Sequence, residues 1–227
     1  MRHTSMENTN MSETLKTQEK KTTLVNFILD KSGSMESVVD STISGFNEYI
    51  GKLKNDGNSY EFSLTFFDTE VVKKYVATPI RNVDSLNKDN YQPMGGTALY
   101  DAVCSTVRSI ERDLVEGVKV LNVILTDGEE NASRLHTERD FSDMVKRLEG
   151  KGNWTFVFLG ANQDSWARAS KWGFAMNNVS NFHSTAAGMG GTFNMLASNT
   201  SAFASSATAS TRSFMSDEDK AMLEATK

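Results

Sequence analysis

The 227-residue sequence predicts a doubly wound α/β fold, with a mostly parallel sheet of about six strands, one antiparallel edge strand and helices on both faces. Two observations predict this fold. Nearly continuous apolar segments, as at residues 24–30 and 118–126, are typical of parallel strands buried on both faces. Segments with apolar residues at steps of three and four alternate with them and indicate amphipathic helices.

The first half of the fold is expected to contain three strands and one helix. A strand over residues 24–30 leads into a helix over residues 36–53, whose buried stripe is Val39, Ile43, Phe46, Ile50 and Leu53. Two β-rich segments at residues 60–67 and 71–77 are separated by only three residues, a spacing that predicts a hairpin. The second of these is expected to be the antiparallel edge strand.

The second half alternates helices with strands. The expected elements are a helix beginning near Thr97, a strand over residues 118–126, a helix beginning at Thr137, a strand over residues 154–159, a helix over residues 164–172 and a short strand over residues 179–182. Thr137 resembles a helix cap, because the acidic residues that follow it are favoured by the dipole of a helix N-terminus.

Composition divides the chain into three parts. Residues 1–21 are polar throughout and are expected to be a disordered leader, while residues 22–183 hold the α/β domain. Residues 184–227 are rich in Ala, Ser and Thr with scattered Phe and Met, so they could form a flexible linker or a helix lying on the domain. Near the end of this extension, Ser216 and the acidic residues after it predict a short capped helix.

Oxygen-bearing side chains gather where three connections should leave the same edge of the sheet. They occur in the segments 30–34 (DKSGS), 95–97 (GGT) and 126–128 (TDG). Ligands bind in such folds beyond the carboxyl ends of the strands. Hydroxyls, carboxylates and water are hard ligands, suited to magnesium, calcium or manganese rather than to zinc or copper. The candidate metal ligands are Asp30, Ser32, Ser34, Thr97 and Asp127.

Glycines accompany each of these segments. Gly33, Gly95, Gly96 and Gly128 are expected to support the loops. The pair at 95 and 96 permits positive φ angles and lets the loop approach an ion closely. Taken singly, each segment could be an ordinary helix cap or turn. Their occurrence together, each in the expected context, favours a metal site.

In this order, the three segments closely resemble the metal-ion-dependent adhesion site of von Willebrand factor A (vWA) domains, over residues 22–183. The chain most resembles small, single-domain microbial vWA proteins, in which a strand-to-helix turn is similar to the segment Phe158-Leu159-Gly160-Ala161-Asn162-Gln163-Asp164. The resemblance implies a non-enzymatic module that binds Mg²⁺ or Mn²⁺, ahead of Ca²⁺, and captures an Asp or Glu of a protein partner. It also implies that the Thr97 loop shifts toward the ion when the partner arrives.

A metal-dependent phosphotransferase or phosphatase of the haloacid-dehalogenase type is the alternative function. Such enzymes need a second Asp two residues after the first, and Ser32 occupies that position. Other catalytic pairs are missing as well, since Cys104 has no obvious histidine partner. His136 is the histidine expected nearest to the ion. Glu129 and Glu130 could surround the ion with negative charge or lie in a solvated loop.

Charge and composition exclude several classes of partner. The net charge is −5 and basic residues are scattered, which argues against nucleic acid as a partner. A single cysteine excludes an internal disulfide and favours a reducing, cytoplasmic location. No segment approaches the roughly 18 apolar residues of a membrane span, and residues 1–21 lack the apolar centre of a signal peptide. The oligomeric state cannot be inferred from the sequence.

Overall fold

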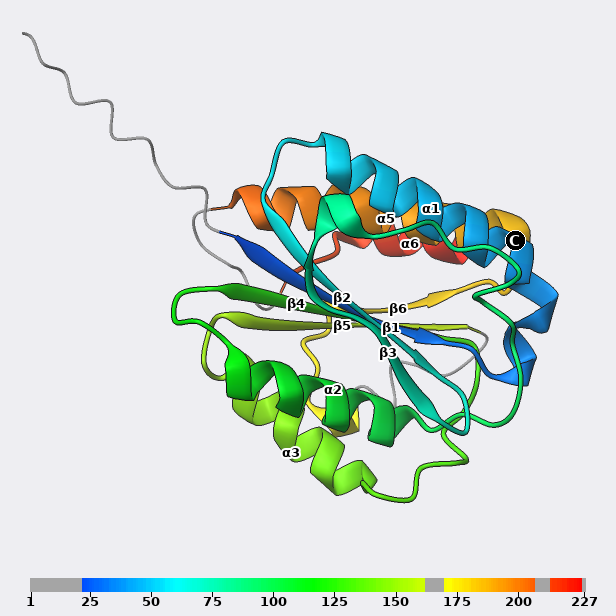
Figure 1. Ribbon diagram of the computed structural model, residues 1–227, viewed down its shortest axis with the longest axis horizontal. Helices are drawn as coiled ribbons and strands as arrows, with labels where there is room; N and C mark the ends of the chain where they lie inside the picture. The colour runs from blue at the N-terminus through cyan, green and yellow to red at the C-terminus, as the bar shows by residue number, and fades with distance from the viewer. Residues whose placement is uncertain (1–21, 162–169, 207–212, 226–227) are drawn as a thin grey trace, which may run out of the picture.

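A central sheet with helices on both faces forms the domain (Figure 1). The computed structural model describes residues 22–161, 170–206 and 213–225. The strands lie in the order β3-β2-β1-β4-β5-β6, and every neighbouring pair is parallel except β2 with β3. The fold class predicted from the sequence is confirmed. The strands are β1 (Thr23–Asp30), β2 (Tyr60–Phe67), β3 (Val71–Pro79), β4 (Lys119–Thr126), β5 (Trp154–Ala161) and β6 (Val179–Phe182).

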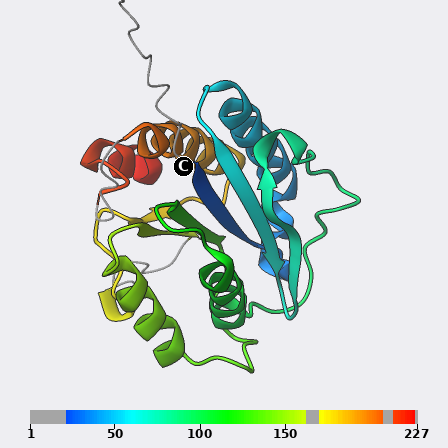
Figure 2. The same ribbon diagram turned by 60° about the vertical axis from the view of Figure 1, so that its left-hand side comes forward.

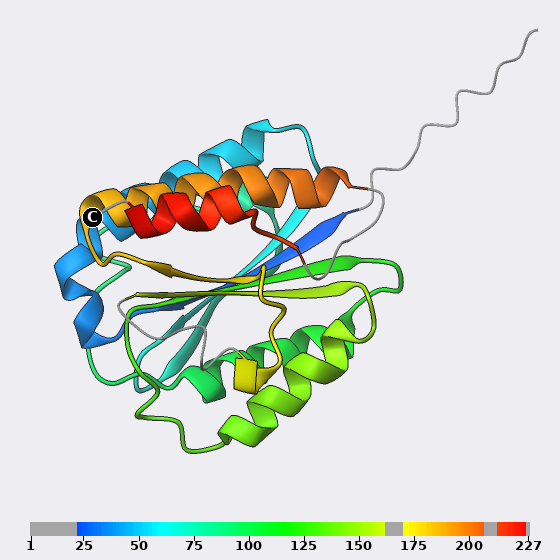
Figure 3. The ribbon, with the colours of Figure 1, turned by 180° about the vertical axis from the view of Figure 1, so that it is seen from behind.

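The helices form two layers, and Figure 2 shows the sheet between them. The layer on one face consists of α1 (Val39–Asn55), α5 (Ala186–Ser205) and α6 (Asp217–Ala225), which lie side by side in Figure 3. The layer on the other face consists of α2 (Leu99–Asp113) and α3 (Glu138–Glu149). Two short 3₁₀ helices, η1 (Gly33–Val38) and η2 (Ile80–Asn82), lie in the connections.

Alternation along the buried strands divides the apolar side chains between two cores. On β1, Val25, Phe27 and Leu29 pack toward α1 and α5, whereas Leu24 and Ile28 pack toward α2 and α3. Successive side chains of a strand point to opposite faces, so a strand covered on both faces needs apolar residues at nearly every position. This requirement explains the continuous apolar segments in the sequence.

The element boundaries differ from the predicted ones mainly around the first helix. Residues 33–38 form η1, so the α-helix begins at Val39 rather than at residue 36. The tighter turn starts with a hydrogen bond from the Met35 N–H to the Ser32 carbonyl (3.1 Å). The predicted helix at 164–172 and the predicted leader fall largely or wholly outside the described residues, although residues 170–172 are helical.

Helix α5, within the segment that could have been a flexible linker, packs against α1. The Phe193 ring stacks on Phe27, with ring centroids 6.0 Å apart and planes 11° from parallel. At the other end of α5, the Lys119 ammonium group donates to the carbonyls of Phe203, Ala204 and Ser206 at 2.7, 3.0 and 2.9 Å. A cation is favoured at a helix C-terminus. The described part of residues 184–227 therefore shares the core of the domain.

No helix within residues 22–161, 170–206 and 213–225 is both long and apolar enough to cross a bilayer.

We predict that Gly45→Ala destabilises the protein although alanine is the better helix former. A Cβ at residue 45 of α1 would overlap the Phe193 ring. Helix propensity favours alanine by about 1 kcal/mol, whereas overpacking a core costs about 1–3 kcal/mol. Chemical denaturation should therefore show a lower free energy of unfolding. Gly51→Ala, on the same helix with open space around it, is the matched control and should raise the free energy of unfolding. Equal gains for both variants would contradict the packing of α5 on α1.

Candidate metal centre

The carboxylate of Asp30 is fixed at the end of β1. Asp30 is fully buried, and the backbone N–H of Ser32 donates to Oδ1 at 2.6 Å. The hydroxyl of Thr126 donates to Oδ2 at 2.5 Å. Thr126 ends β4, which pairs in parallel with β1, so the sheet register brings the two side chains together. Both oxygens of Asp30 are thereby oriented before any ligand binds.

Three of the five predicted ligands lie close to Gly128, and the other two adjoin them. The position that a Cβ would take on Gly128 lies 2.6 Å from Thr97 Oγ1, 3.3 Å from Ser32 Oγ and 3.4 Å from Asp30 Oδ2. Ser34 Oγ lies 3.1 Å from Ser32 Oγ and donates to Asp127 Oδ1 at 2.5 Å. Oxygens from three distant segments of the chain therefore surround one small space that only glycine leaves free. Their binding of a metal stays a prediction.

Burial makes the charge of these carboxylates costly. Burial is the largest influence on Asp30 and raises its pKa to about 6, while the hydrogen bonds from Thr126 and Ser32 lower it and the nearby Asp127 raises it further. Burial also raises the pKa of Asp127 above its ordinary value. Lys31, the cation adjacent in sequence, pairs with Asp68 instead (3.0 Å). A divalent cation would supply the missing positive charge.

The donor set fits a hard cation. Within the described ranges, no cluster of three or more His, Cys, Asp and Glu side chains could hold a metal ion. The site at Gly128 has two carboxylates and three hydroxyls, so it depends on neutral oxygens. Magnesium and manganese accept such oxygens together with water, and magnesium is often held by only one or two carboxylates. The residues present are therefore compatible with either ion.

Hydrogen bonds tether the Thr97 loop on three sides. Met94 N–H donates to the Lys31 carbonyl (2.8 Å), and Gly33 N–H donates to the Gly95 carbonyl (3.2 Å). Ala98 N–H donates to the Asp68 carbonyl (2.8 Å).

Two side chains also hold this loop. Gly96 N–H donates to Thr69 Oγ1 (2.8 Å), and Thr97 N–H donates to Asn131 Oδ1 (2.9 Å). The loop expected to shift is thus well held in this structure.

The surroundings of the four supporting glycines differ from one position to the next. Of the pair at 95 and 96, only Gly95 adopts the positive φ that glycine permits (+71°). A Cβ on Gly96 would instead lie 2.7 Å from Asn131 Oδ1. Gly128 is required by the ligand oxygens themselves. A Cβ on Gly33 would make only an ordinary contact, 3.5 Å from the Gly95 carbonyl oxygen.

Glu130 links its own loop to the start of α2. Its carboxylate accepts hydrogen bonds from the N–H groups of Ala132 (3.0 Å), Ser133 (2.8 Å) and Tyr100 (3.1 Å), and from the Ser133 hydroxyl (2.7 Å). Negative charge is favoured at a helix N-terminus. Glu130 therefore fixes the loop after β4 to α2. Glu129 is exposed.

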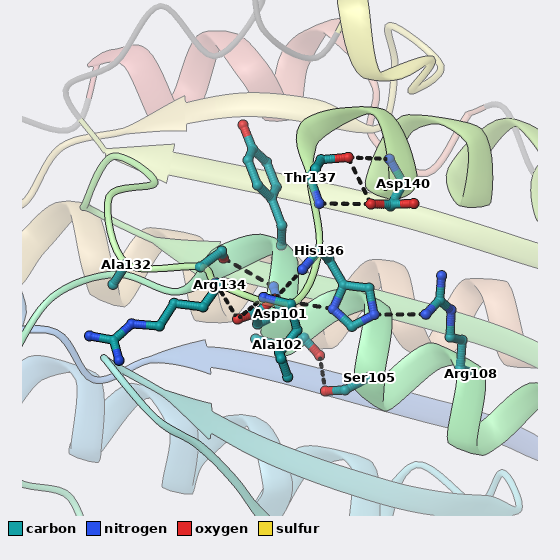
Figure 4. A network of polar contacts seen from close by, with 12 residues as sticks. Asp101, Ala102, Ser105, Arg108, Ala132, Arg134, His136, Thr137 and Asp140 are labelled. Carbon is teal, nitrogen blue, oxygen red and sulfur yellow. Dashed lines mark hydrogen bonds and ion pairs between the residues drawn. The ribbon is translucent and has the colours of Figure 1, made fainter.

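Asp101 holds the next part of the same loop, a role that the sequence patterns did not predict (Figure 4). Its carboxylate accepts from the backbone N–H groups of Arg134 (2.7 Å), Leu135 (3.0 Å) and His136 (2.7 Å). Burial alone would raise its pKa, but these hydrogen bonds hold the pKa below its ordinary value. An acidic residue in the first turn of a helix was the available signal. Its loop partners were not readable from the sequence.

His136 contacts Asp101 and Arg108 rather than the candidate metal ligands (Figure 4). Its Nδ1 lies 3.1 Å from Asp101 Oδ1, and its Nε2 lies 2.7 Å from Arg108 Nη1. A guanidinium group only donates, so Nε2 accepts and Nδ1 carries the proton that faces Asp101. His136 therefore helps Asp101 to hold the loop in front of α3 and is not a candidate metal ligand.

Comparisons of sequence and of structure give different results. No protein-family model and no curated protein sequence matches the chain. Solved structures do. Mussel byssus proximal thread matrix protein 1, in a structure with a zinc-occupied metal-ion-dependent adhesion site, superposes with a TM-score of 0.59 at 16% identity, covering 80% of this chain and 46% of that one. The von Willebrand factor domain of the pilus tip protein Mfa5 from Porphyromonas gingivalis gives 0.58 at 11% identity, covering 82% and 97%.

A third structure, manganese-loaded TRAP protein from Plasmodium vivax, gives a TM-score of 0.53 at 16% identity and covers 72% of this chain and 69% of that one. The chain spans less than half the length of the mussel protein. At these identities the comparison concerns the fold, and that fold is the one shared by von Willebrand factor A domains.

We predict that Asp30→Asn stabilises the metal-free protein at neutral pH. The folded pKa of about 6 lies above the ordinary value of 3.8, so the stability associated with protonated Asp30 is lost as pH rises from about 4 to about 6. The shift corresponds to about 3 kcal/mol at most. In chelator, the variant should melt above the wild type at pH 7 and lose that advantage near pH 4. Asp89→Asn, on an exposed turn, is the control. A less stable Asp30→Asn protein at pH 7 would contradict the cost of the buried charge.

Proposed function

We propose that this chain, which has the fold of von Willebrand factor A domains, is a protein-binding module that acts through a divalent cation. The convergence of Asp30, Ser32 and Thr97 oxygens on one point beside Gly128 carries this proposal. Ser34 and Asp127 extend the same group of oxygens. In the proposed function, the bound cation offers a coordination position that a carboxylate of the partner can take.

The residues of the chain would divide the work of holding the ion. Asp30 and Asp127 supply negative charge, directly or through water, and both already share that charge with hydrogen-bond donors of the chain. The three hydroxyls add oxygen without adding charge. An outside Asp or Glu is therefore attracted to the ion, whereas a site built from carboxylates alone would repel it.

Several observations favour binding over catalysis. Asp30, which would be the nucleophile of a dehalogenase-type phosphatase, is fully buried with hydrogen bonds to both oxygens. Ser32 stands where the second catalytic Asp would be needed. Burial raises the pKa of the Cys104 thiol to about 12, which leaves it protonated at neutral pH. We therefore propose that the chain is not an enzyme.

The choice of ion and the location of the protein belong to the same proposal. Hard oxygen donors favour Mg²⁺ or Mn²⁺. The neighbours described above include one structure with zinc and one with manganese, which supports a divalent ion without selecting one. We propose a cytoplasmic location from the single cysteine and an acidic side chain as the feature recognised in the partner.

We predict that Mn²⁺ and Mg²⁺ each bind at one site and stabilise the protein. At a concentration one hundred times the dissociation constant, the stabilisation should be about 2.7 kcal/mol. Calorimetry and thermal unfolding, with Zn²⁺ as a competitor, measure both quantities. Asp30→Ala should abolish binding, whereas Asp89→Ala should leave it unchanged. A folded wild-type protein that shows neither heat nor stabilisation at millimolar metal would exclude the metal site.

We also predict that peptides selected for binding in Mg²⁺ and released by chelator will each depend on one Asp or Glu. Replacing that residue by Asn or Gln should abolish binding, because the amide cannot supply the charge that the cation attracts. Peptides that bind equally well in chelator, or without an acidic residue, would contradict this mode of capture. Metal-dependent hydrolysis of a phosphate ester that Asp30→Asn abolishes would favour the phosphatase instead.

A further inference from the structure

We infer that Asn131 is a positioning residue that sets the Thr97 hydroxyl for the cation. This inference rests on the proposed function, because it concerns the affinity of the same metal site. Asn131 is four residues beyond Asp127 and is not among the five predicted ligands. It acts on Thr97, which comes just before α2, whereas the other four ligands come from the end of β1 or from the loops that follow β1 and β4.

Asn131 binds both backbone groups of Thr97. Its side-chain Oδ1 accepts a hydrogen bond from Thr97 N–H at 2.9 Å. Its own backbone N–H donates to the Thr97 carbonyl at 3.0 Å, and the N–H of Ala132 donates to the same carbonyl at 3.2 Å. With both peptide groups fixed, the direction of the Thr97 side chain from its Cα is also fixed. The hydroxyl then points toward Gly128.

The loop that carries Asn131 is itself anchored on both sides of this contact. Glu130 ties it to the N–H of Tyr100 at the start of α2. Asp101, in the first turn of α2, accepts the N–H groups of Arg134 and His136 (Figure 4). These hydrogen bonds fix the loop on both sides of Asn131, so Asn131 can in turn fix the position of Thr97.

The packing around Gly96 gives independent support. A Cβ at residue 96 would lie 2.7 Å from Asn131 Oδ1 and 3.2 Å from the Ala132 Cβ. Gly96 has no positive φ that would require glycine. The missing side chain instead leaves room for the amide of Asn131. The chain thus reserves this space for the group that holds Thr97.

A consequence is that the loop after β4, which begins at Asp127, is hydrogen-bonded to Thr97 although 30 residues separate Asp127 from Thr97 in sequence. Removing the amide of Asn131 should let Thr97 turn away from the ion while the other ligands stay in place. Outer-shell partners of metal ligands typically change metal affinity by about 10–100-fold when mutated. Because Asn131 acts through Thr97, its loss should cost no more affinity than the loss of the Thr97 hydroxyl.

The test measures Mn²⁺ affinity of the full chain by calorimetry in a double-mutant cycle. Asn131→Ala should weaken Mn²⁺ binding about tenfold in the wild-type background and hardly at all in the Thr97→Ala background. Asn131→Asp, which keeps an acceptor oxygen for Thr97 N–H, should restore the affinity. Gly96→Ala, which displaces the amide, should weaken binding as Asn131→Ala does.

Asn47→Ala is the matched control. Asn47 also binds both backbone groups of one residue, Leu86, but it does so through its side-chain amide alone, which accepts from the Leu86 N–H at 2.7 Å and donates to the Leu86 carbonyl at 2.9 Å. It has no hydrogen bond to the five ligands. It should lower the melting temperature without changing Mn²⁺ affinity. Unchanged affinity in Asn131→Ala, or an equal loss in the Thr97→Ala background, would overturn the inference alone. A folded wild-type chain that does not bind Mn²⁺ would overturn the proposed function with it.

Discussion

The buried carboxylate of Asp30 is the constraint on which the candidate site depends. A charge at the end of a central strand is costly, and the fold reduces that cost with two hydrogen bonds, from Ser32 N–H and the Thr126 hydroxyl. Burial nevertheless raises the pKa of Asp30 to about 6. The metal-free domain therefore keeps an electrostatic strain that a bound cation would relieve. Metal affinity and the stability of the metal-free fold are opposed at this residue.

The sheet register turns that constraint into a site. Parallel pairing of β1 with β4 aligns Leu29 with Leu125, so Asp30 and Thr126 end adjacent strands at the same edge. The loops after the two strands then bring Ser34 and Asp127 together. The third segment joins from the start of α2, where the tethers to Asp68 and Asn131 bring Thr97 to Gly128. Local sequence thus supplies the oxygens, while strand order and loop contacts supply their convergence.

Patterns of short range made most of the fold and the membership of the candidate site predictable. Strand burial follows from continuous apolar runs such as residues 118–126, and the oxygens at 30, 32 and 34 follow from their spacing after a strand. The fit of α5 could not be predicted, because it depends on Gly45 meeting Phe193 across 148 residues of sequence. The loop partners of Asp101 and the bond from Tyr100 N–H to Glu130 were hidden for the same reason, because 30 or more residues separate the bonded groups. An acidic residue in the first turn of a helix is a general signal, but it does not identify the distant N–H groups that the carboxylate binds.

The tethers of the Thr97 loop limit how that residue can move when a partner binds. A shift of Thr97 alone would break three hydrogen bonds. One joins its N–H to the Asn131 side chain, and the other two join its carbonyl to the N–H groups of Asn131 and Ala132. At a net value of about 0.5–1.5 kcal/mol each, these bonds oppose the shift by several kcal/mol. A partner can supply that energy only by binding the shifted state correspondingly more tightly. Moving Thr97 together with the loop after β4 keeps all three bonds, but that loop begins at Asp127. That movement would still break the bonds from Gly96 N–H to Thr69 and from Ala98 N–H to Asp68, and it would pull Asp127 from Ser34. The hydrogen bonds of this site therefore resist both movements, and a partner must offset their loss.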